Sequence, residues 1–179
     1  MVSSVKRIAI IGSGGAGKST LARRLGATLG VEVIHLDAVY WREGWNATPS
    51  PEWERTVAAL VQRESWIMDG NFAGTLDTRC RAADTLIFLD VPRSVCFCRV
   101  LYRQLAYWGR TRPDMAPGCP EKLDAGFLQW IWRYPLYSRP RVLRKLEHYA
   151  AGRTVVKLRS STEVKRFLKE IKARHSSPE

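Results

Sequence analysis

The stretch that most constrains this chain is IAIIGSGGAGKST, residues 8–20, in which an apolar run leads into a glycine-rich turn. Gly12, Gly17, Lys18 and Ser19 fit the pattern G-x-x-x-x-G-K-[ST], which binds phosphate where it follows a strand and opens a helix. Glycines permit positive φ, so backbone N–H groups can turn inward around an anion, and the helix N-terminus adds its dipole. The pattern therefore predicts a nucleotide-binding loop.

The sequence around this loop alternates short β-branched runs with longer helical patterns. Strands are expected at 6–13, 31–37, 65–70, 84–91 and 153–160. Helices are expected at 18–29, 50–63, 94–108, 123–150 and 161–174. Strands alternating with helices indicate an α/β fold with a parallel sheet and helices on both faces. Ligands of such sheets bind at the carboxyl ends of the strands, and Gly12, Asp37, Asp69 and Asp90 all fall at or near such ends.

The loop itself assigns the first site residues. In loops of this type the lysine, here Lys18, reaches the β and γ phosphates, and the hydroxyl, here Ser19, ligates Mg²⁺. ATP and Mg²⁺ are therefore the expected cofactors. The residues expected to hold the nucleotide here are Gly12, Gly14, Gly15, Ala16, Gly17, Lys18, Ser19 and Thr20.

Motors, switches and small kinases all use such a loop, and other motifs separate them. The guanine-reading tetrad N-K-x-D of GTPases does not occur, and the apolar strand WIMDG ends in the single acid Asp69 and not in paired acids. Arg99 and Arg103 lie four residues apart on one face of the expected helix, and Arg110 and Arg112 follow in a loop with proline and glycine. Because the transition state of phosphoryl transfer spreads negative charge over oxygens, positioned arginines favour a kinase. The alternative is a solvated helix face and an ordinary surface loop.

The segment after the second expected strand, residues 35–49, is where we expect the acceptor of the phosphoryl group. Asp37 could accept the proton of an acceptor hydroxyl, and Trp41 could stack on a base or sugar. Asn71 and Arg79 are further candidates on the acceptor side. The alternative interpretation is that the aspartate is a cap and the aromatic side chain belongs to the core.

Taken together, GSGGAGKST, WIMDGNF, ADTLIFLDVPRSVCFCRVLYRQ and GRTRPDM resemble the adenylate-kinase-like P-loop kinases. Within that group the sequence is most similar to the bacterial proteins called topology modulation protein, or FlaR-type. The length of 179 residues indicates a single domain at 1–179. The resemblance implies a five-stranded parallel sheet with order 2-3-1-4-5 along the chain. It also implies an acceptor-side segment at about 37–64 and a short LID at about 109–121.

The resemblance also implies roles for single residues. Asp69 resembles the aspartate that holds the water shell of Mg²⁺, Arg99 an arginine near the adenine, and Arg103 an arginine that clamps phosphate. Nucleoside monophosphate kinases follow their Asp-Gly pair with FPRT, whose arginine holds the acceptor phosphate. In this chain Asn71 follows that pair, and the first arginine after it is Arg79.

Charge and composition leave a second class of function open. Lys+Arg 29 against Asp+Glu 17 gives a formal net charge of +12, which attracts polyanions such as nucleotides and nucleic acid. A nucleotide-dependent nucleic-acid binder and a simple ATPase are therefore the alternatives to a kinase. The four cysteines show no metal or redox spacing, and no apolar run approaches the roughly 18 residues of a membrane span. We expect a cytoplasmic protein; the acceptor and the oligomeric state stay open.

Overall fold

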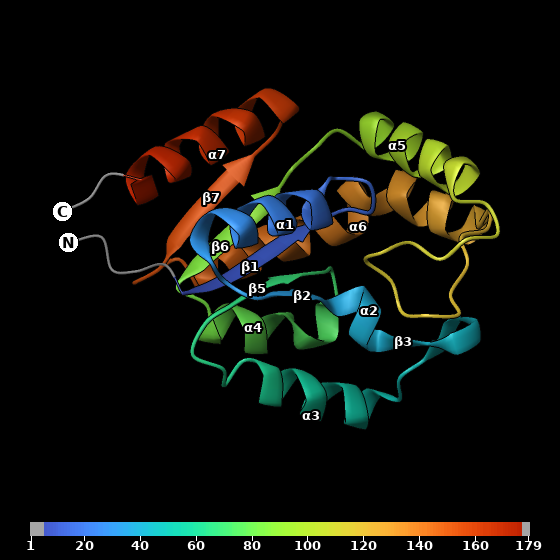
Figure 1. Cartoon of the computed structure of the whole chain (residues 1–179), viewed down its shortest axis with the longest axis horizontal. Coiled ribbons are helices and arrows are strands. Elements are labelled where there is room, and N and C mark those ends of the chain that lie inside the picture. The colour runs from blue at the N-terminus through green and yellow to red at the C-terminus, as the bar shows by residue number, and fades with distance from the viewer. Residues whose placement is uncertain (1–5, 177–179) are drawn as a thin grey trace.

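The structure, a computed structural model, describes residues 6–176, so the ends of the predicted domain at 1–179 lie outside the described residues. Five strands form one parallel sheet with the order β2-β5-β1-β6-β7 (Figure 1). The strands are β1 Arg7–Gly12, β2 Val33–His35, β5 Trp66–Asp69, β6 Thr85–Leu89 and β7 Thr154–Leu158. Counted among these five along the chain, the order is 2-3-1-4-5, which confirms the predicted fold class.

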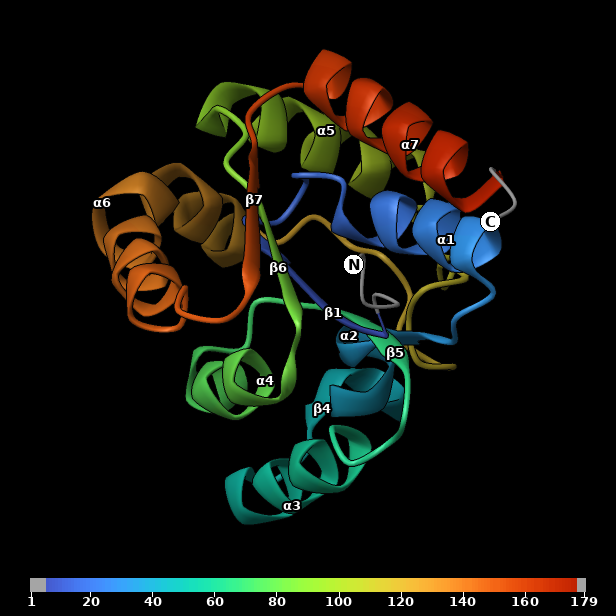
Figure 2. The same ribbon diagram turned by 90° about the vertical axis from the view of Figure 1, so that its left-hand side faces the viewer.

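Helices cover both faces of this sheet. Helices α1, α5 and α7 lie on one face, and α3, α4 and α6 lie on the other (Figure 2). Their bounds are α1 Lys18–Leu29, α3 Ser50–Leu60, α4 Leu76–Ala82, α5 Arg93–Ala106, α6 Ala125–His148 and α7 Ser161–Ser176. The central strand β1 is buried on both sides, and Ile8, Ala9, Ile10 and Ile11 are all at most 1% exposed. This is why the segment reads as a continuous apolar run and does not alternate.

The region after β2 departs from the expected strand at 31–37. The strand ends at His35, and Asp37 lies in the first turn of a short helix, α2 Leu36–Tyr40. A two-stranded antiparallel hairpin follows, formed by β3 Trp41–Arg42 and β4 Asn46–Ala47 around a 3₁₀ turn, η1 Glu43–Trp45. Helix α4, with the short turn η2 Ala73–Thr75 before it, was not expected either.

The segment between α5 and α6, residues 107–124, contains the predicted LID and is called the LID below. Backbone hydrogen bonds close its base, from Gly109 N to Glu121 O (3.0 Å) and from Glu121 N to Arg110 O (3.0 Å). The LID arches over the carboxyl ends of the strands and reaches the β3–β4 hairpin (Figure 1). None of the helices in residues 6–176 is long and apolar enough to cross a bilayer.

The LID and the hairpin are packed against each other. Gly44 N donates to Gly118 O (2.9 Å) and the Trp45 indole N–H donates to Pro120 O (2.9 Å). Below these bonds the side chains of Met115, Ala116 and Cys119 form a small apolar cluster, against which two indoles of the hairpin pack, those of Trp41 and Trp45. The two segments therefore form one continuous wall beside the phosphate-binding loop.

Candidate functional site

A cavity of about 480 Å³ opens at the carboxyl ends of the strands, which is within the range of small-ligand sites. It lies between the phosphate-binding loop, α5, the hairpin and the LID. The sequence-predicted residues that line it are Gly14, Gly15, Gly17, Lys18, Ser19, Thr20, Asp37, Trp41, Arg99, Arg103 and Arg112. The fold therefore brings together residues from the phosphate-binding loop, the predicted acceptor side, α5 and the LID.

The phosphate-binding loop has the backbone that its glycines allow. Gly15 and Gly17 have φ of 75° and 97°, in the left-handed region. The Lys18 ammonium donates to the carbonyl oxygens of Gly12 (3.0 Å) and Ser13 (2.9 Å), which holds it at the mouth of the loop. Burial lowers the pKa of Lys18, partly offset by the charges of Asp37 and Asp69. An anion placed in the loop would replace these carbonyls as the partner of the ammonium.

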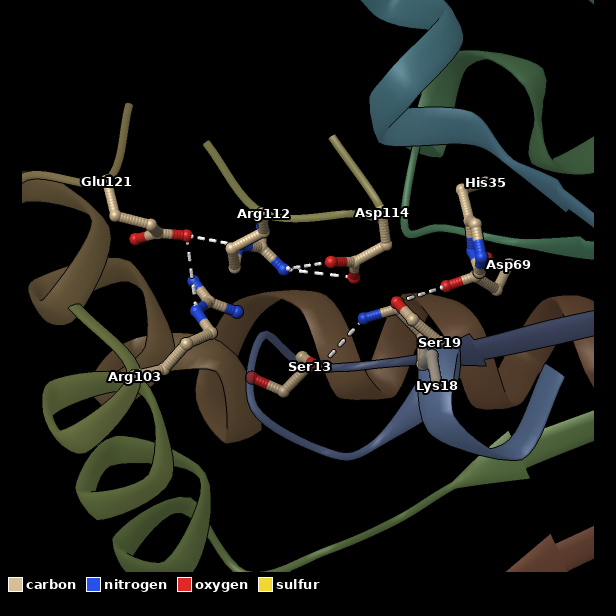
Figure 3. A network of polar contacts seen from close by, with 9 residues as sticks. All are labelled: Ser13, Lys18, Ser19, His35, Asp69, Arg103, Arg112, Asp114 and Glu121. Atoms are coloured by element: carbon tan, nitrogen blue, oxygen red, sulfur yellow. Dashed lines mark hydrogen bonds and ion pairs between the residues drawn. The ribbon is translucent and has the colours of Figure 1, made fainter. Parts of the chain in front are cut away.

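Behind the loop, Ser19 is tied to the end of strand β5. The Ser19 hydroxyl donates to Asp69 Oδ2 (2.8 Å), and Asp69 Oδ1 lies 2.5 Å from His35 Nδ1 (Figure 3). Asp69 is only 4% exposed, and its hydrogen bond raises the pKa of His35. Mg²⁺ prefers hard oxygen ligands and retains several waters, and a serine hydroxyl beside a buried carboxylate fits such an ion.

Two arginines converge from opposite sides on a single buried acid. Arg103 of α5 and Arg112 of the LID both form ion pairs with Glu121, which is 3% exposed; the Arg103 pair is 3.3 Å long (Figure 3). Arg112 also donates to both oxygens of Asp114 (3.0 Å each). Burial lowers the pKa of Arg103, with Arg112 as the next cause. The cluster presents two cations to the cavity, held in place by two carboxylates.

Asp37 lines the same cavity as these cations. Burial raises the pKa of its carboxyl, and Lys18 and Arg112 only partly oppose that effect. A carboxylate that holds a proton more readily than usual, in reach of a cation-lined cavity, is suited to accept one from a hydroxyl. This is the role that the sequence predicted for it.

Other predicted residues lie elsewhere. Arg110 is exposed and does not line the cavity, and neither does Asn71. Arg79 is fully buried, and its guanidinium donates to the carbonyl oxygens of Gly70 (3.1 Å) and Phe72 (2.9 Å). Its desolvation lowers its pKa to about 10. Arg79 therefore holds the backbone after β5, and its place in the structure gives no support to the predicted contact with an acceptor.

Within the phosphate-binding loop, Gly12 and Ala16 also do not line the cavity. The backbone of Gly12 serves the site through the carbonyl that accepts from Lys18. Ala16 is 4% exposed and belongs to the core under the loop.

Several residues of the site were not predicted, and those with charged or polar contacts there include His35, Asp114 and Glu121. The acids of the LID stand among its arginines in GRTRPDMAPGCPE, and an acid near an arginine reads equally well as a surface ion pair. His35 directly precedes α2, at the end of β2, the same edge of the sheet as Asp69. Its position at a strand end was the available signal.

No family model and no curated protein matches the sequence. Several solved structures are similar in fold. The shikimate kinase from Acinetobacter baumannii in complex with shikimate aligns with TM-score 0.57 and 16% identity over 93% of this chain and 90% of that one. A gluconokinase from Sinorhizobium meliloti aligns with TM-score 0.53 and 18% identity, over 96% of this chain and 92% of that one. The deoxyadenosine kinase from M. mycoides with bound dATP aligns with TM-score 0.51 and 17% identity, over 92% and 98%. The chain thus has the fold of P-loop kinases.

Proposed function

We propose that this chain is an ATP-dependent phosphotransferase that moves the γ-phosphoryl group to a small acceptor. The observation that carries the proposal is the convergence of Lys18, Arg103 and Arg112 with the carboxylate of Asp37 on one cavity. The fold shared with kinases of shikimate, gluconate and deoxyadenosine supports the same class of reaction. The acceptors of those three proteins are the first compounds to test.

The donor side would be held by the phosphate-binding loop. Backbone N–H groups from Gly14 to Thr20 would bind the phosphates. Arg99, which donates to Gly15 O (3.5 Å) and Ser161 Oγ (2.9 Å), would border the nucleotide. Ser19 and Asp69 would hold Mg²⁺ and its waters. When bound, the ion neutralises charge on the β and γ phosphate oxygens.

The residues of the chain then have distinct tasks. Asp37 accepts the proton of the attacking hydroxyl, while Lys18, Arg103 and Arg112 stabilise the charge that develops on the transferred group. For Arg103 and Arg112 to do so, phosphate oxygens must compete with Glu121 and Asp114 for the guanidinium groups. The LID covers the cavity and limits the access of water, which favours transfer over hydrolysis.

The test is binding and turnover of the Lys18→Ala variant. We expect acceptor-dependent formation of ADP to fall by at least 100-fold, because removal of one preorganised cation typically costs about 10²–10³ in kcat. Lys165→Ala, on the exposed side of α7, is the matched control and should behave as the parent protein. Normal turnover by the Lys18 variant would refute the proposal. ADP formation that no acceptor accelerates would indicate the simple ATPase.

The net charge of +12 favours a second candidate, nucleotide-dependent binding of nucleic acid of the kind that the resemblance to topology modulation proteins implies. Its signature is affinity that falls steeply with salt. Fluorescence anisotropy with duplex DNA at two salt concentrations, with and without ATP, separates it from the kinase. Binding that depends on ATP would support it, and weak binding that ignores ATP would leave only a basic surface.

A further inference from the structure

One wall of the cavity differs in character from the rest. Beside the phosphate-binding loop, the cavity is lined by two indoles, two carboxylates and a thioether, contributed by α2, the hairpin and the LID. These residues are Asp37, Trp41, Trp45, Asp114 and Met115, and they are called the acceptor wall below. If the proposed function holds, this wall meets the group that receives the phosphoryl.

The indoles of the acceptor wall offer ring surface. Trp41 and Trp45 are half-buried, with ring centroids 5.5 Å apart in an edge-to-face arrangement. The Trp45 N–H is already bound to Pro120 O (2.9 Å). A ligand at Trp45 therefore meets an aromatic surface, which favours stacking on a flat ring over hydrogen bonding.

The backbone at this point is strained. Trp45 has φ of 64°, in the left-handed region that bulky residues rarely occupy. Such a conformation costs of order 1–3 kcal/mol and persists where the surroundings hold it, commonly at ligand sites. Here the LID holds it through Pro120 and Gly118, which bonds the neighbouring Gly44. The fold thus stores strain to place this indole at the cavity.

The charges of the acceptor wall are negative. Asp37 and Asp114 both line the cavity, and Asp114 accepts two hydrogen bonds from the Arg112 guanidinium. Arg112 is shared between Asp114 and Glu121, and Lys18 is bonded to the loop carbonyls. Two exposed cations that line the cavity have no carboxylate or carbonyl partner among the described residues. These are Arg23 on α1, on the side of His35, and Lys122 of the LID. An acceptor that carried its own anionic group would face the two carboxylates, and Arg23 and Lys122 would be the cations free to meet it.

The presence of a base points the same way. A phosphate oxygen that attacks needs no proton removed, whereas a hydroxyl does. The carboxylate of Asp37 lines the cavity, and burial raises its pKa and so its affinity for that proton. A carboxylate is a useful neighbour for a hydroxyl and a repulsive one for an anion.

We propose that the acceptor is a ring-bearing alcohol with no anionic group of its own, of the nucleoside or amino-sugar class, held between the tryptophans and the carboxylates of the acceptor wall. In the reaction the acceptor oxygen forms a bond to the γ-phosphorus, and the bond from that phosphorus to the β,γ-bridging oxygen breaks. ADP leaves with the electron pair of that bond, and the hydroxyl proton passes to Asp37. The product carries a phosphate beside two carboxylates and is repelled, so it is released and is not phosphorylated again.

The experiment is a matched acceptor screen with γ-labelled ATP. Each nucleoside is paired with its 5′-monophosphate, each amino sugar with its 6-phosphate, and the acids shikimate and gluconate complete the panel. We expect kcat/KM to be at least about tenfold higher for the unphosphorylated member of a pair than for its phosphorylated partner. Shikimate and gluconate should not be turned over faster than the unphosphorylated compounds. Equal or better use of monophosphates, lost in Arg23→Gln, would overturn this inference while leaving the kinase intact. Failure of the whole panel with ATP binding retained would also overturn it. Failure of ATP binding itself would instead remove the proposed function.

Two variants test the wall directly. Trp41→Ala should raise the acceptor KM about tenfold, since stacking on one aromatic ring contributes about 1–3 kcal/mol, and leave the Kd of ATP unchanged. Its control is Trp132→Ala, an exposed tryptophan on α6 outside the cavity. Asp114→Asn, which keeps the shape of the side chain, should narrow the preference for the unphosphorylated member of each pair. The corresponding change at Asp77, an exposed acid outside the cavity, should not. A preference that Asp114→Asn leaves unaltered counts against the acidic wall as its cause.

Discussion

Gly15 is the position of the phosphate-binding loop that tolerates a side chain least, although the motif itself leaves it free. A Cβ there would stand 2.3 Å from the carbonyl oxygen of Cys96 and 2.9 Å from Val100 Cγ2, both on α5, and its φ is 75°. Gly152, in the turn before β7, has nearly the same φ of 73° with nothing within 4 Å of its Cβ position. Alanine substitutions at Gly15 and Gly152 therefore separate the cost of a left-handed backbone from the cost of the steric clash with α5.

We expect Gly15→Ala to lower the free energy of unfolding by about 2–5 kcal/mol. About 1–2 kcal/mol of this is the left-handed conformation of a residue with a Cβ. The displacement of the loop from α5 contributes about 1–3 kcal/mol more, because a backbone carbonyl cannot rotate away as a flexible side chain can. Gly152→Ala should show only the first contribution. Because the displaced loop also carries the inward N–H groups, Gly15→Ala should weaken ATP binding and Gly152→Ala should not.

The measurements are urea unfolding of both variants, with midpoints compared at unchanged slope, and ATP titration by calorimetry. If the two variants lose the same stability, the loop does not rest against α5 as the structure has it. A Gly15→Ala variant that is destabilised but binds ATP normally would show that the phosphate-binding loop keeps its backbone conformation. That result would refute the predicted loss of ATP affinity.

Two further changes test the acceptor side. Asp37→Asn should lower kcat by about 10²–10⁴. Asp37→Asn should also raise the free energy of unfolding at neutral pH. Burial raises the pKa of Asp37, so above the unfolded pKa the ionised carboxylate destabilises the folded state, and in acid this penalty vanishes. Urea midpoints of the variant and the parent protein at pH 7 and pH 3 check this, and an equal shift at both pH values would contradict it. For the same reason the acid limb of kcat in the parent protein should lie above the ordinary aspartate pKa of 3.8, and a limb at or below that value would exclude Asp37 as the base. Arg79→Leu should lower the free energy of unfolding by about 2 kcal/mol or more, because the carbonyls of Gly70 and Phe72 lose their hydrogen-bond donor. The affinity for ATP should not change. A raised acceptor KM at unchanged stability would instead make Arg79 the acceptor ligand that the sequence predicted.

The donor half of the site was readable from the sequence because its signals are local. The spacing of Gly12, Gly17, Lys18 and Ser19 specifies a turn whose partners lie within a few residues. The strand order followed from the resemblance to the P-loop kinases, and Asp69 lies at the predicted strand end. Its hydrogen bond with Ser19 follows because parallel strands bring their carboxyl ends to one edge of the sheet.

The acceptor half was less readable, since its contacts join segments far apart in the chain. Trp45 meets Pro120 across 75 residues, and the Cys119 thiol donates to the carbonyl of Arg42 across 77. No role was predicted for Cys119, which is fully buried where the LID meets the hairpin. Arg79 shows the opposite difficulty: its distance from the Asp-Gly pair suits an anion ligand, yet a fully buried guanidinium bonded to two carbonyls holds backbone.

The packing of the LID on the hairpin has a consequence for the order of events in catalysis. In the proposed function the LID contributes Arg112 to the phosphates, and the hairpin contributes Trp41 and Trp45 to the other substrate. Because the two segments pack together, displacing one disturbs the contacts of the other. Binding at either end therefore changes the free energy of binding at the other by the same amount, as linkage requires. A compound that only fills the space between the tryptophans should slow the dissociation of the nucleotide it never touches. Each substrate would then set the residence time of the other.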